Sequence, residues 1–174
     1  MIKDFQMTST VETRATDGRG DGIFALGPFE AGDTLYVGVL DEIRIKNHSH
    51  ASQIGKTSFG FHSGLSSIFN HSCDPNCGIR INETGGHDIV AIRHISAGDE
   101  AVYDYAMRNY QIQHFPCPCS CGAANCRNSI TGWKDLPQNR KDAYASFVAP
   151  YLIEIDIEQA AAIRLAHAPD RHIS

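Results

Sequence analysis

Four cysteines lie close together in the segment CPCSCGAANC, at positions 117, 119, 121 and 126, and this spacing limits how the segment can fold. The N-terminal residues MIKDFQMTST contain no apolar signal core, so we expect an intracellular protein. In that setting, clustered cysteines indicate a metal site more often than disulfides. The alternative, a set of reduced thiols packed in the core, does not account for such close spacing.

The pattern Cys119-x-Cys121-x4-Cys126 supplies three thiolates from one tight loop, in which Gly122 allows a sharp turn between ligands. Zinc takes four such ligands in a tetrahedron, at about 2.3 Å each. The loop therefore predicts a zinc site whose fourth ligand comes from elsewhere in the chain. The candidates are the remaining cysteines, Cys73, Cys77 and Cys117.

Length and composition allow one domain with a real core. The chain has 174 residues, of which 42% are hydrophobic. The formal net charge of −5 argues against a nucleic-acid binder, because such proteins usually carry a basic patch. A mildly acidic surface can attract a basic peptide, although most acidic domains are simply soluble. No apolar run is long enough to span a membrane.

Alternating patterns and Gly-rich turns predict a mainly β protein. A hairpin is expected about Gly85-Gly86. The predicted strands cover residues 23–29, 33–45, 78–82, 88–95 and 100–105.

The C-terminal part has a helical pattern instead. A first helix is predicted by residues that recur at helical spacing, namely Arg140, Tyr144, Phe147 and Tyr151. An Ala-rich second helix is expected to begin at a cap formed by Asp156. Pro150 is expected to separate the two helices. The predicted fold class is therefore α+β, mainly β with short C-terminal helices.

Two polar segments are candidates for a binding site. In DGRGDGIFA, residues 17–25, alternating glycines remove side chains where the backbone has to approach something closely, although an ordinary Gly-rich turn is equally compatible. In NHSCDPN, residues 70–76, Asn70 and His71 can orient a polar ligand. A rival interpretation makes His71 and Cys73 a nucleophilic pair, but the sequence indicates no third, orienting group.

The segment GDEAVYDY, residues 98–105, places Tyr103 and Tyr105 on the same face of a predicted strand, with Asp104 opposite. A tyrosine hydroxyl can donate, accept and line a narrow slot. Considered alone, the pair is more simply explained as core aromatics.

Taken in order, GRGDGIFA, NHSCDPN, GDEAVYDY and CSCGAANCR resemble the motifs of SET-domain methyltransferases followed by a post-SET zinc loop. The matched region runs from about Asp17 to Ile130. The resemblance implies a β-clip fold with a knot-like crossing. It divides the chain into a SET domain over 1–112 with core motifs at 17–105, a post-SET loop over 113–133 and a helical extension over 134–174.

The resemblance also implies the ligands. S-adenosylmethionine would be held by backbone groups of Gly20, Asp21 and Gly22 and by the side chains of Asn70 and His71, and Ile130 could pack on it. Cys73 would join Cys119, Cys121 and Cys126 on zinc.

In the family that the sequence resembles, Tyr105 matches the catalytic tyrosine, and Tyr103 matches a position that governs how many methyl groups are added. The implied function is mono- or dimethylation of a lysine side chain in a protein substrate, of which a histone tail is one example. Two alternatives are a small-molecule or non-histone substrate, suggested by the short insert over 41–66, and a non-catalytic zinc-stabilised binding module. The module is suggested by Asp21 and Ser67, which depart from the family pattern.

Overall fold

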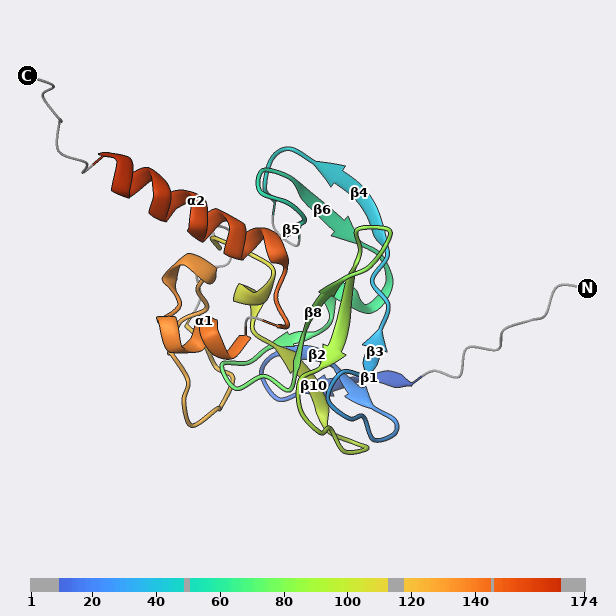
Figure 1. The fold of residues 1–174 in the computed structure, drawn as a ribbon. Helices are drawn as coiled ribbons and strands as arrows, with labels where there is room; N and C mark the ends of the chain where they lie inside the picture. Colours follow the sequence, from blue (N-terminus) through green and yellow to red (C-terminus); the bar gives the residue numbers. More distant parts are fainter. Residues whose placement is uncertain (1–9, 49–50, 113–117, 145, 167–174) are drawn as a thin grey trace, which may run out of the picture.

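The computed structural model describes residues 10–48, 51–112, 118–144 and 146–166, so Cys117 lies outside the described residues. All the strands precede the two α-helices, which lie together on one side of the strands (Figure 1). The strands are β1 (Val11–Thr16), β2 (Gly20–Ala25), β3 (Thr34–Tyr36), β4 (Leu40–Arg44), β5 (Ser52–Gln53), β6 (Phe59–His62), β7 (Asn70–His71), β8 (Cys77–Ile81), β9 (His87–Ala91) and β10 (Glu100–Tyr103). The helices are the 3₁₀ turns η1 (Gly64–Ser67), η2 (Tyr105–Met107) and η3 (Trp133–Asp135), followed by α1 (Gln138–Tyr144) and α2 (Pro150–Ala166). The predicted fold class, mainly β with C-terminal helices, is confirmed.

The strands form two sheets. The larger has the order β1-β2-β10-β8-β9-β3, with β7 also paired to β10, and the smaller has the order β4-β6-β5. The predicted hairpin is confirmed, since β8 and β9 pair antiparallel with Ile81 opposite His87, and Gly85 has φ of 82° in the connecting turn. This positive φ explains the glycine there.

The prediction of one continuous strand over 33–45 is wrong. The chain breaks after β3 and enters the second sheet as β4. Gly38 lies in the break, where a Cβ atom would sit 2.1 Å from the carbonyl oxygen of His87, and its N–H donates to Asp88 Oδ1 at 3.0 Å. Contact with β9, distant in sequence, therefore redirects a segment whose local pattern predicts a single strand.

Strand β10 joins three segments that are far apart in the sequence. It pairs antiparallel with β2 and parallel with β7 and β8. Its inward residues, Ala101 and Tyr103, are fully buried, so the strand lies in the core. Because β2 and β7 carry the Gly-rich and Asn-His motifs, this pairing places both motifs beside the tyrosine segment.

The predicted strand over 100–105 ends early. β10 stops at Tyr103, and Tyr105 begins the 3₁₀ turn η2. Asp104 caps that turn, with its Oδ1 accepting from the N–H of Ala106 at 3.2 Å. The two tyrosines therefore do not share a strand face as predicted, although their ring centroids lie 5.2 Å apart.

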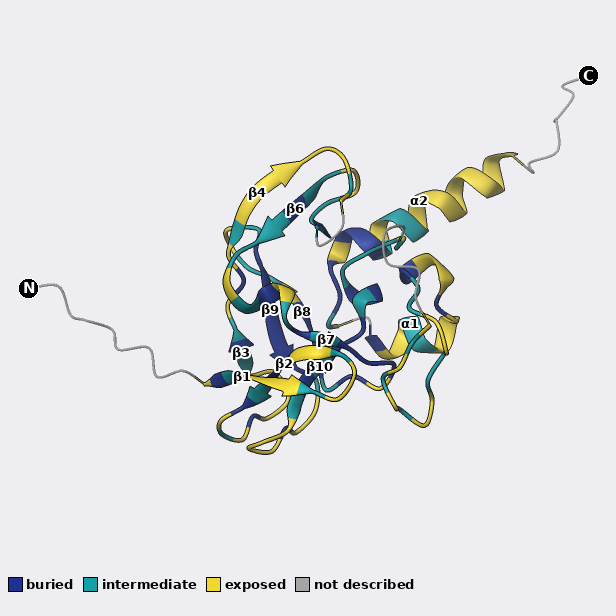
Figure 2. Cartoon of the chain, turned by 180° about the vertical axis from the view of Figure 1, so that it is seen from behind, coloured by how far each residue is buried: buried dark blue, intermediate teal, exposed yellow. Residues whose placement is uncertain are grey.

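The second helix begins earlier than predicted. Helix α2 starts at Pro150, a residue suited to the first helical position, and Asp156 lies inside the helix rather than at its cap. The Asp156 carboxylate instead accepts from Trp133 Nε1 at 2.8 Å and from Lys141 Nζ at 2.6 Å. The outer end of α2 is exposed whereas β9 is buried (Figure 2). Among the described helices, none is long and apolar enough to cross a membrane.

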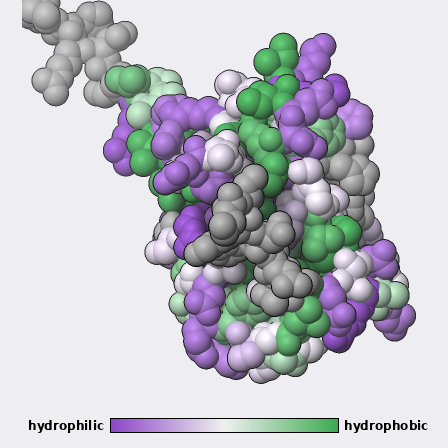
Figure 3. Space-filling view, turned by 90° about the vertical axis from the view of Figure 1, so that its right-hand side faces the viewer, coloured by the Kyte–Doolittle hydropathy of each residue, from purple (hydrophilic) through white to green (hydrophobic). Residues whose placement is uncertain are grey.

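The surface on the side of β3 and β4 carries several exposed apolar residues. They form separate patches between hydrophilic ones rather than a single apolar face (Figure 3). The large examples there are Val37, Val39, Ile43 and Ile45. Scattered apolar residues of this kind are normal on a protein surface.

A buried ion pair connects the sheet to the segment after the cysteines. Asp104 is fully buried, and its two oxygens accept from Arg127 Nη1 at 2.6 Å and Nη2 at 3.0 Å. The hydroxyl of Tyr144, from α1, adds a bond to Asp104 at 3.3 Å. One carboxylate thus holds η2, the cysteine loop and α1 together.

We expect Asp104→Ala to destabilise the fold by about 3–5 kcal/mol, because Arg127 would be left as an uncompensated buried charge. Urea denaturation measures this change. Arg93→Ala is the control, since it removes an ion pair with Asp74 in which both side chains are about half exposed. The control should cost less than about 1 kcal/mol. Equal effects of the two substitutions would contradict the role given to Asp104.

Candidate functional site

A pocket of about 170 Å³ lies where the predicted motifs meet. Four of the sequence-predicted residues outside the cysteine group line it, namely Asn70, His71, Tyr105 and Ile130. Its full lining is Gly18, Arg19, Asn70, His71, Tyr105, Pro118, Cys119, Ser120, Cys121 and Ile130. The Gly-rich turn, the Asn-His motif, the tyrosine turn and the cysteine loop therefore share one pocket.

Asn70 connects this pocket to the Gly-rich segment. Its Nδ2 donates to the carbonyl oxygen of Asp21 at 3.1 Å and to Glu100 Oε1 at 2.8 Å. At Gly22, a Cβ atom would lie 2.5 Å from the same Glu100 oxygen and 3.0 Å from Asn70 Nδ2. Gly20 has φ of 73°. Close packing explains the glycine at position 22, and the positive φ explains the one at position 20. Neither residue lines the pocket.

His71 is buried and neutral. Burial lowers its pKa to about 4, an effect that the nearby carboxylate of Asp104 only partly offsets. Its Nδ1 accepts from the N–H of Tyr105 at 3.3 Å, and its ring meets the Tyr105 ring edge-on at 5.3 Å. His71 therefore positions the tyrosine turn.

The imidazole of His71 also lies near a thiol, since its Nε2 is 3.4 Å from Cys73 Sγ. Asp104 Oδ1 lies 3.6 Å from His71 Nδ1, but that nitrogen accepts from the N–H of Tyr105, so Asp104 does not act as the third, orienting group. Cys73 Sγ is also 3.8 Å from Cys119 Sγ, and burial raises the pKa of Cys73. This thiol belongs to a group of sulfurs, and a raised pKa disfavours a nucleophilic thiolate.

Four sulfur atoms form a compact group, in which all lie within 4.8 Å of one another. In a tetrahedral zinc site with about 2.3 Å bonds, neighbouring sulfurs lie about 3.8 Å apart. The members are Cys73, Cys119, Cys121 and Cys126. The donor set therefore fits zinc in both number and chemistry.

Backbone N–H groups point at these sulfurs. Arg127 N lies 3.4 Å from Cys73 Sγ, and Asn128 N lies 3.3 Å from Cys126 Sγ. Burial alone would raise the pKa of Cys121, but bonds from the N–H groups of Cys73 and Ala123 and from neighbouring thiols lower it to about 6. Such bonds favour thiolates, the form that binds metal.

Cys77 is separate from the group. Its side chain is fully buried, and burial raises its pKa to about 12. Cys77 is not among the four sulfurs that lie within 4.8 Å of one another, so among the described cysteines Cys73 is the remaining candidate for the fourth ligand.

The two tyrosine hydroxyls have different surroundings. Tyr105 donates to the carbonyl oxygen of Phe69 at 3.1 Å and borders the pocket. Tyr103 is fully buried, and its hydroxyl has no hydrogen-bond partner among the described residues. Burial raises the pKa of Tyr103, so the phenol stays neutral and can donate.

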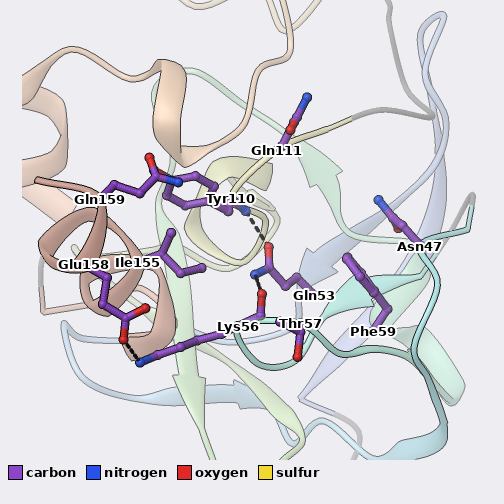
Figure 4. Close-up of a pocket in the computed structure, with 10 residues that line it drawn as sticks. All are labelled: Asn47, Gln53, Lys56, Thr57, Phe59, Tyr110, Gln111, Ile155, Glu158 and Gln159. Carbon is purple, nitrogen blue, oxygen red and sulfur yellow. Dashed lines mark hydrogen bonds and ion pairs between the residues drawn. The ribbon is translucent and has the colours of Figure 1, made fainter. Parts of the chain in front are cut away.

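A second pocket, of about 380 Å³, lies between the insert and α2. Figure 4 shows Lys56 reaching Glu158 at one end, at 2.5 Å, and Gln53 hydrogen-bonded to the backbone of Tyr110 at 2.8 Å. The lining residues are Asn47, Gln53, Lys56, Thr57, Phe59, Tyr110, Gln111, Ile155, Glu158 and Gln159. Tyr105 lines the first pocket and Tyr110 the second, so the segment 105–110 contributes to both.

Two residues of the first site were missed by sequence reasoning. Arg19 lines the pocket, and its Nη2 pairs with Glu100 Oε2 at 2.6 Å. Both fall inside segments that the sequence singles out, GRGDGIFA and GDEAVYDY. Their pairing depends on the contact between β2 and β10, which no local pattern reveals.

Comparisons with known proteins identify relatives of part of the chain. A "Histone-lysine N-methyltransferase, H3 lysine-4 specific" of Saccharomyces cerevisiae is 40% identical over 70 residues, which cover 38% of this chain and 6% of that protein. "Histone-lysine N-methyltransferase ATXR7" of Arabidopsis thaliana is 34% identical over 124 residues, covering 60% of this chain and 8% of that one. The chain thus spans less than a tenth of these relatives.

Solved structures share the fold. Two structures of KRYPTONITE, one with mCHG DNA and SAH and one with mCHH DNA, an H3(1-15) peptide and SAH, align with TM-scores of 0.58 and 0.56. Each is 21% identical and covers 69% of this chain, and the alignments cover 28% and 29% of those chains. The family model for the SET domain matches residues 20–106, half of the sequence. This chain belongs to the SET domain family.

Proposed function

We propose that this protein is an intracellular S-adenosylmethionine-dependent methyltransferase that transfers methyl groups to a lysine side chain of a protein substrate, mainly to the mono- or dimethyl stage. The observation that carries the proposal is the first pocket, in which Asn70, His71 and Tyr105 meet beside the cysteine loop. The names of the relatives, and the SAH in the structures of similar fold, support the same activity.

The cofactor would occupy the first pocket. Asn70 and Arg19 offer polar groups there, and Ile130 offers an apolar surface. Asp21 and Gly22 place backbone groups beside Asn70, in line with the glycine pattern. When bound, S-adenosylmethionine supplies a sulfonium methyl group that a neutral amine can displace.

Zinc would be held by Cys73, Cys119, Cys121 and Cys126. Three of these ligands come from the loop that forms one wall of the first pocket. Cys73 comes from the Asn-His motif, whose residues Asn70 and His71 line the same pocket. A metal at this point would therefore keep the pocket wall in place, which is a structural role rather than a catalytic one.

The reaction requires a neutral amine. An unperturbed lysine has a pKa of about 10.4, so only about 1 in 2,500 is neutral at pH 7. Once the amine is neutral, holding it in line with the methyl group supplies much of the rate acceleration, with effective molarities of order 10⁵ M or more. Tyr105 would hold the amine in line through its hydroxyl, and the buried hydroxyl of Tyr103 would border the amine.

The protein substrate would approach from the side of the second pocket. This pocket combines Phe59, Tyr110 and Ile155 with amide side chains, a mixture that suits a peptide. Glu154 and Glu158 from α2 pair with Lys56, and all three side chains are 40% or more exposed. The two acidic groups favour a substrate with basic residues near its target lysine.

A peptide array incubated with labelled cofactor tests the function and the substrate class together. We expect label on lysine-containing basic peptides and less label with Tyr105→Phe. Titration with S-adenosylhomocysteine separates the alternatives. A protein that binds it but labels no peptide points to another methyl acceptor, and one that does not bind it is not a methyltransferase of this kind.

For the metal, we expect one zinc per chain in the parent and a clear loss of zinc in Cys73→Ser, because a serine hydroxyl is a poor replacement for a thiolate. Elemental analysis of the purified variants measures this. Cys77→Ser is the matched control and should retain its zinc, since Cys77 lies outside the sulfur group. Full zinc in Cys73→Ser would move the fourth ligand elsewhere, with Cys117 as the next candidate.

For the cofactor, Asn70→Ala should weaken binding of S-adenosylhomocysteine by about 1–3 kcal/mol, the usual cost of losing one polar partner. His71→Ala should weaken it too, but also destabilise the fold, because His71 binds the backbone of Tyr105. Isothermal titration and urea denaturation separate the two effects.

Asn76→Ala is the control for these two variants. Its side chain bonds only backbone groups, the carbonyl oxygen of Glu100 and the N–H of Val102, at 2.8 and 2.9 Å. It should therefore lose stability while its folded fraction binds normally. If Asn70→Ala binds like the parent, Asn70 is structural.

For the tyrosines, the two hydroxyl deletions should differ in kind. Tyr105→Phe should lower the rate of methyl transfer while the ring still packs on His71. Tyr103→Phe should raise the methylation state of the product, because losing the buried hydroxyl leaves room for a further methyl group. Mass spectrometry of product peptides measures both. Trimethyl-lysine as the main product of the parent would contradict the role given to Tyr103.

A further inference from the structure

Arg108 is a partly buried cation that the function described so far does not use. It lies three residues after Tyr105, and its guanidinium carbon stands 5.1 Å from the ring centroid of Tyr103. Its Nε is buried without a hydrogen-bond partner among the described residues. None of the ion pairs between described residues includes Arg108. Even a partly buried cation loses some of its hydration, and without a counter-ion this loss is not compensated, so its presence suggests a function.

The groups around Arg108 come from four elements and do not neutralise it. His62 on β6 and His87 on β9 stack with ring centroids 4.6 Å apart, and the Nδ1 atom of each is buried without a partner among the described residues. Burial and the charge of Arg108 lower the pKa of His62 to about 4 and that of His87 well below its usual value. Both are therefore neutral near pH 7.

The remaining neighbours do not supply a negative charge either. Tyr103 on β10 and Tyr151 on α2 are buried, and burial raises the pKa of both, so each stays neutral. Tyr151 donates to the carbonyl oxygen of Arg108 at 2.9 Å. The nearby carboxylate of Asp104 is already bound at both oxygens by Arg127. The positive charge of Arg108 beside the ring of Tyr103 is thus not neutralised by any of these groups.

We propose that Arg108 keeps the substrate amine unprotonated at the tyrosine pair, acting through its charge without touching the amine. This proposal rests on the proposed lysine methyltransfer. A fixed positive charge near an amine disfavours the ammonium form, and the effect is strong where water is excluded. The guanidinium carbon of Arg108 lies 5.1 Å from the ring centroid of Tyr103, which lies 5.2 Å from that of Tyr105, so the charge is next to one member of the pair.

The kinetic test is the pH dependence of kcat at saturating peptide and cofactor, which reports groups in the bound complex. Removing the cation raises the pKa of the bound amine, so in Arg108→Gln the acid limb should move up by about one pH unit. The rate near neutral pH should then fall about tenfold, while the plateau at high pH is retained. Arg108→Lys keeps the charge and should restore most of the parent profile.

Arg80→Gln is the matched control. It removes the same charge from an exposed site on β8, where Arg80 bonds the hydroxyl of Thr34. Its profile should coincide with that of the parent. Coincident profiles for Arg108→Gln and the parent would overturn the proposal. A purely structural role predicts lower stability, whereas we expect Arg108→Gln to be at least as stable as the parent in urea.

A second measurement needs no activity. Burial is the larger cause of the low pKa of His62 and remains in the variants, so the pKa, followed by NMR in the protein alone, should rise only part of the way from about 4 in Arg108→Gln and change less in Arg108→Lys. An unchanged value would overturn the idea of an uncompensated charge, whether or not the protein transfers methyl groups. If the parent methylates no peptide but the pKa of His62 changes in Arg108→Gln, the proposed function is wrong, and so is the effect of Arg108 on a substrate amine. The uncompensated charge of Arg108 would still be supported.

Discussion

The bond between Asp104 and Arg127 connects the parts from which the site is built. Asp104 follows β10 and caps the turn that carries Tyr105, whereas Arg127 directly follows the last cysteine of the loop. Tyr144 brings α1 to the same carboxylate. Since a broken buried pair leaves an unsatisfied charge, the cysteine loop and the tyrosine turn are held in one arrangement. The pocket between them depends on that arrangement.

Burial controls the protonation states of the site. His71 is neutral because it is buried, so it accepts a bond from the tyrosine turn rather than carrying a charge. Tyr103 is neutral for the same reason. Against this background, the charge of Arg108 stands out, since two neutral histidines and a buried phenol surround it. An amine entering this environment would lose its proton more readily than in water.

The helices outside the matched region contribute to the site. The family model ends at residue 106, whereas α2 supplies Tyr151 to the group around Arg108 and Glu158 to the second pocket. The hydroxyl of Tyr151 also lies within hydrogen-bond distance of the carbonyl oxygen of Gln53, in the insert, so its one proton is shared between this carbonyl group and that of Arg108. The extension therefore joins the insert to the segment after Tyr105, which explains how a short insert can keep a defined position.

The sequence by itself determined the local chemistry: the thiol spacing, the close-approach glycines, the Asn-His motif and the hairpin, because each depends on neighbours a few residues away. Only the tertiary structure decided the break at Gly38, the end of β10 before Tyr105 and the start of α2 at Pro150. The tertiary structure also decided the partners of Glu100 and Asp104 and the surroundings of Arg108. Each of these depends on contacts between segments many residues apart, and local pattern carries no information about which distant groups will meet.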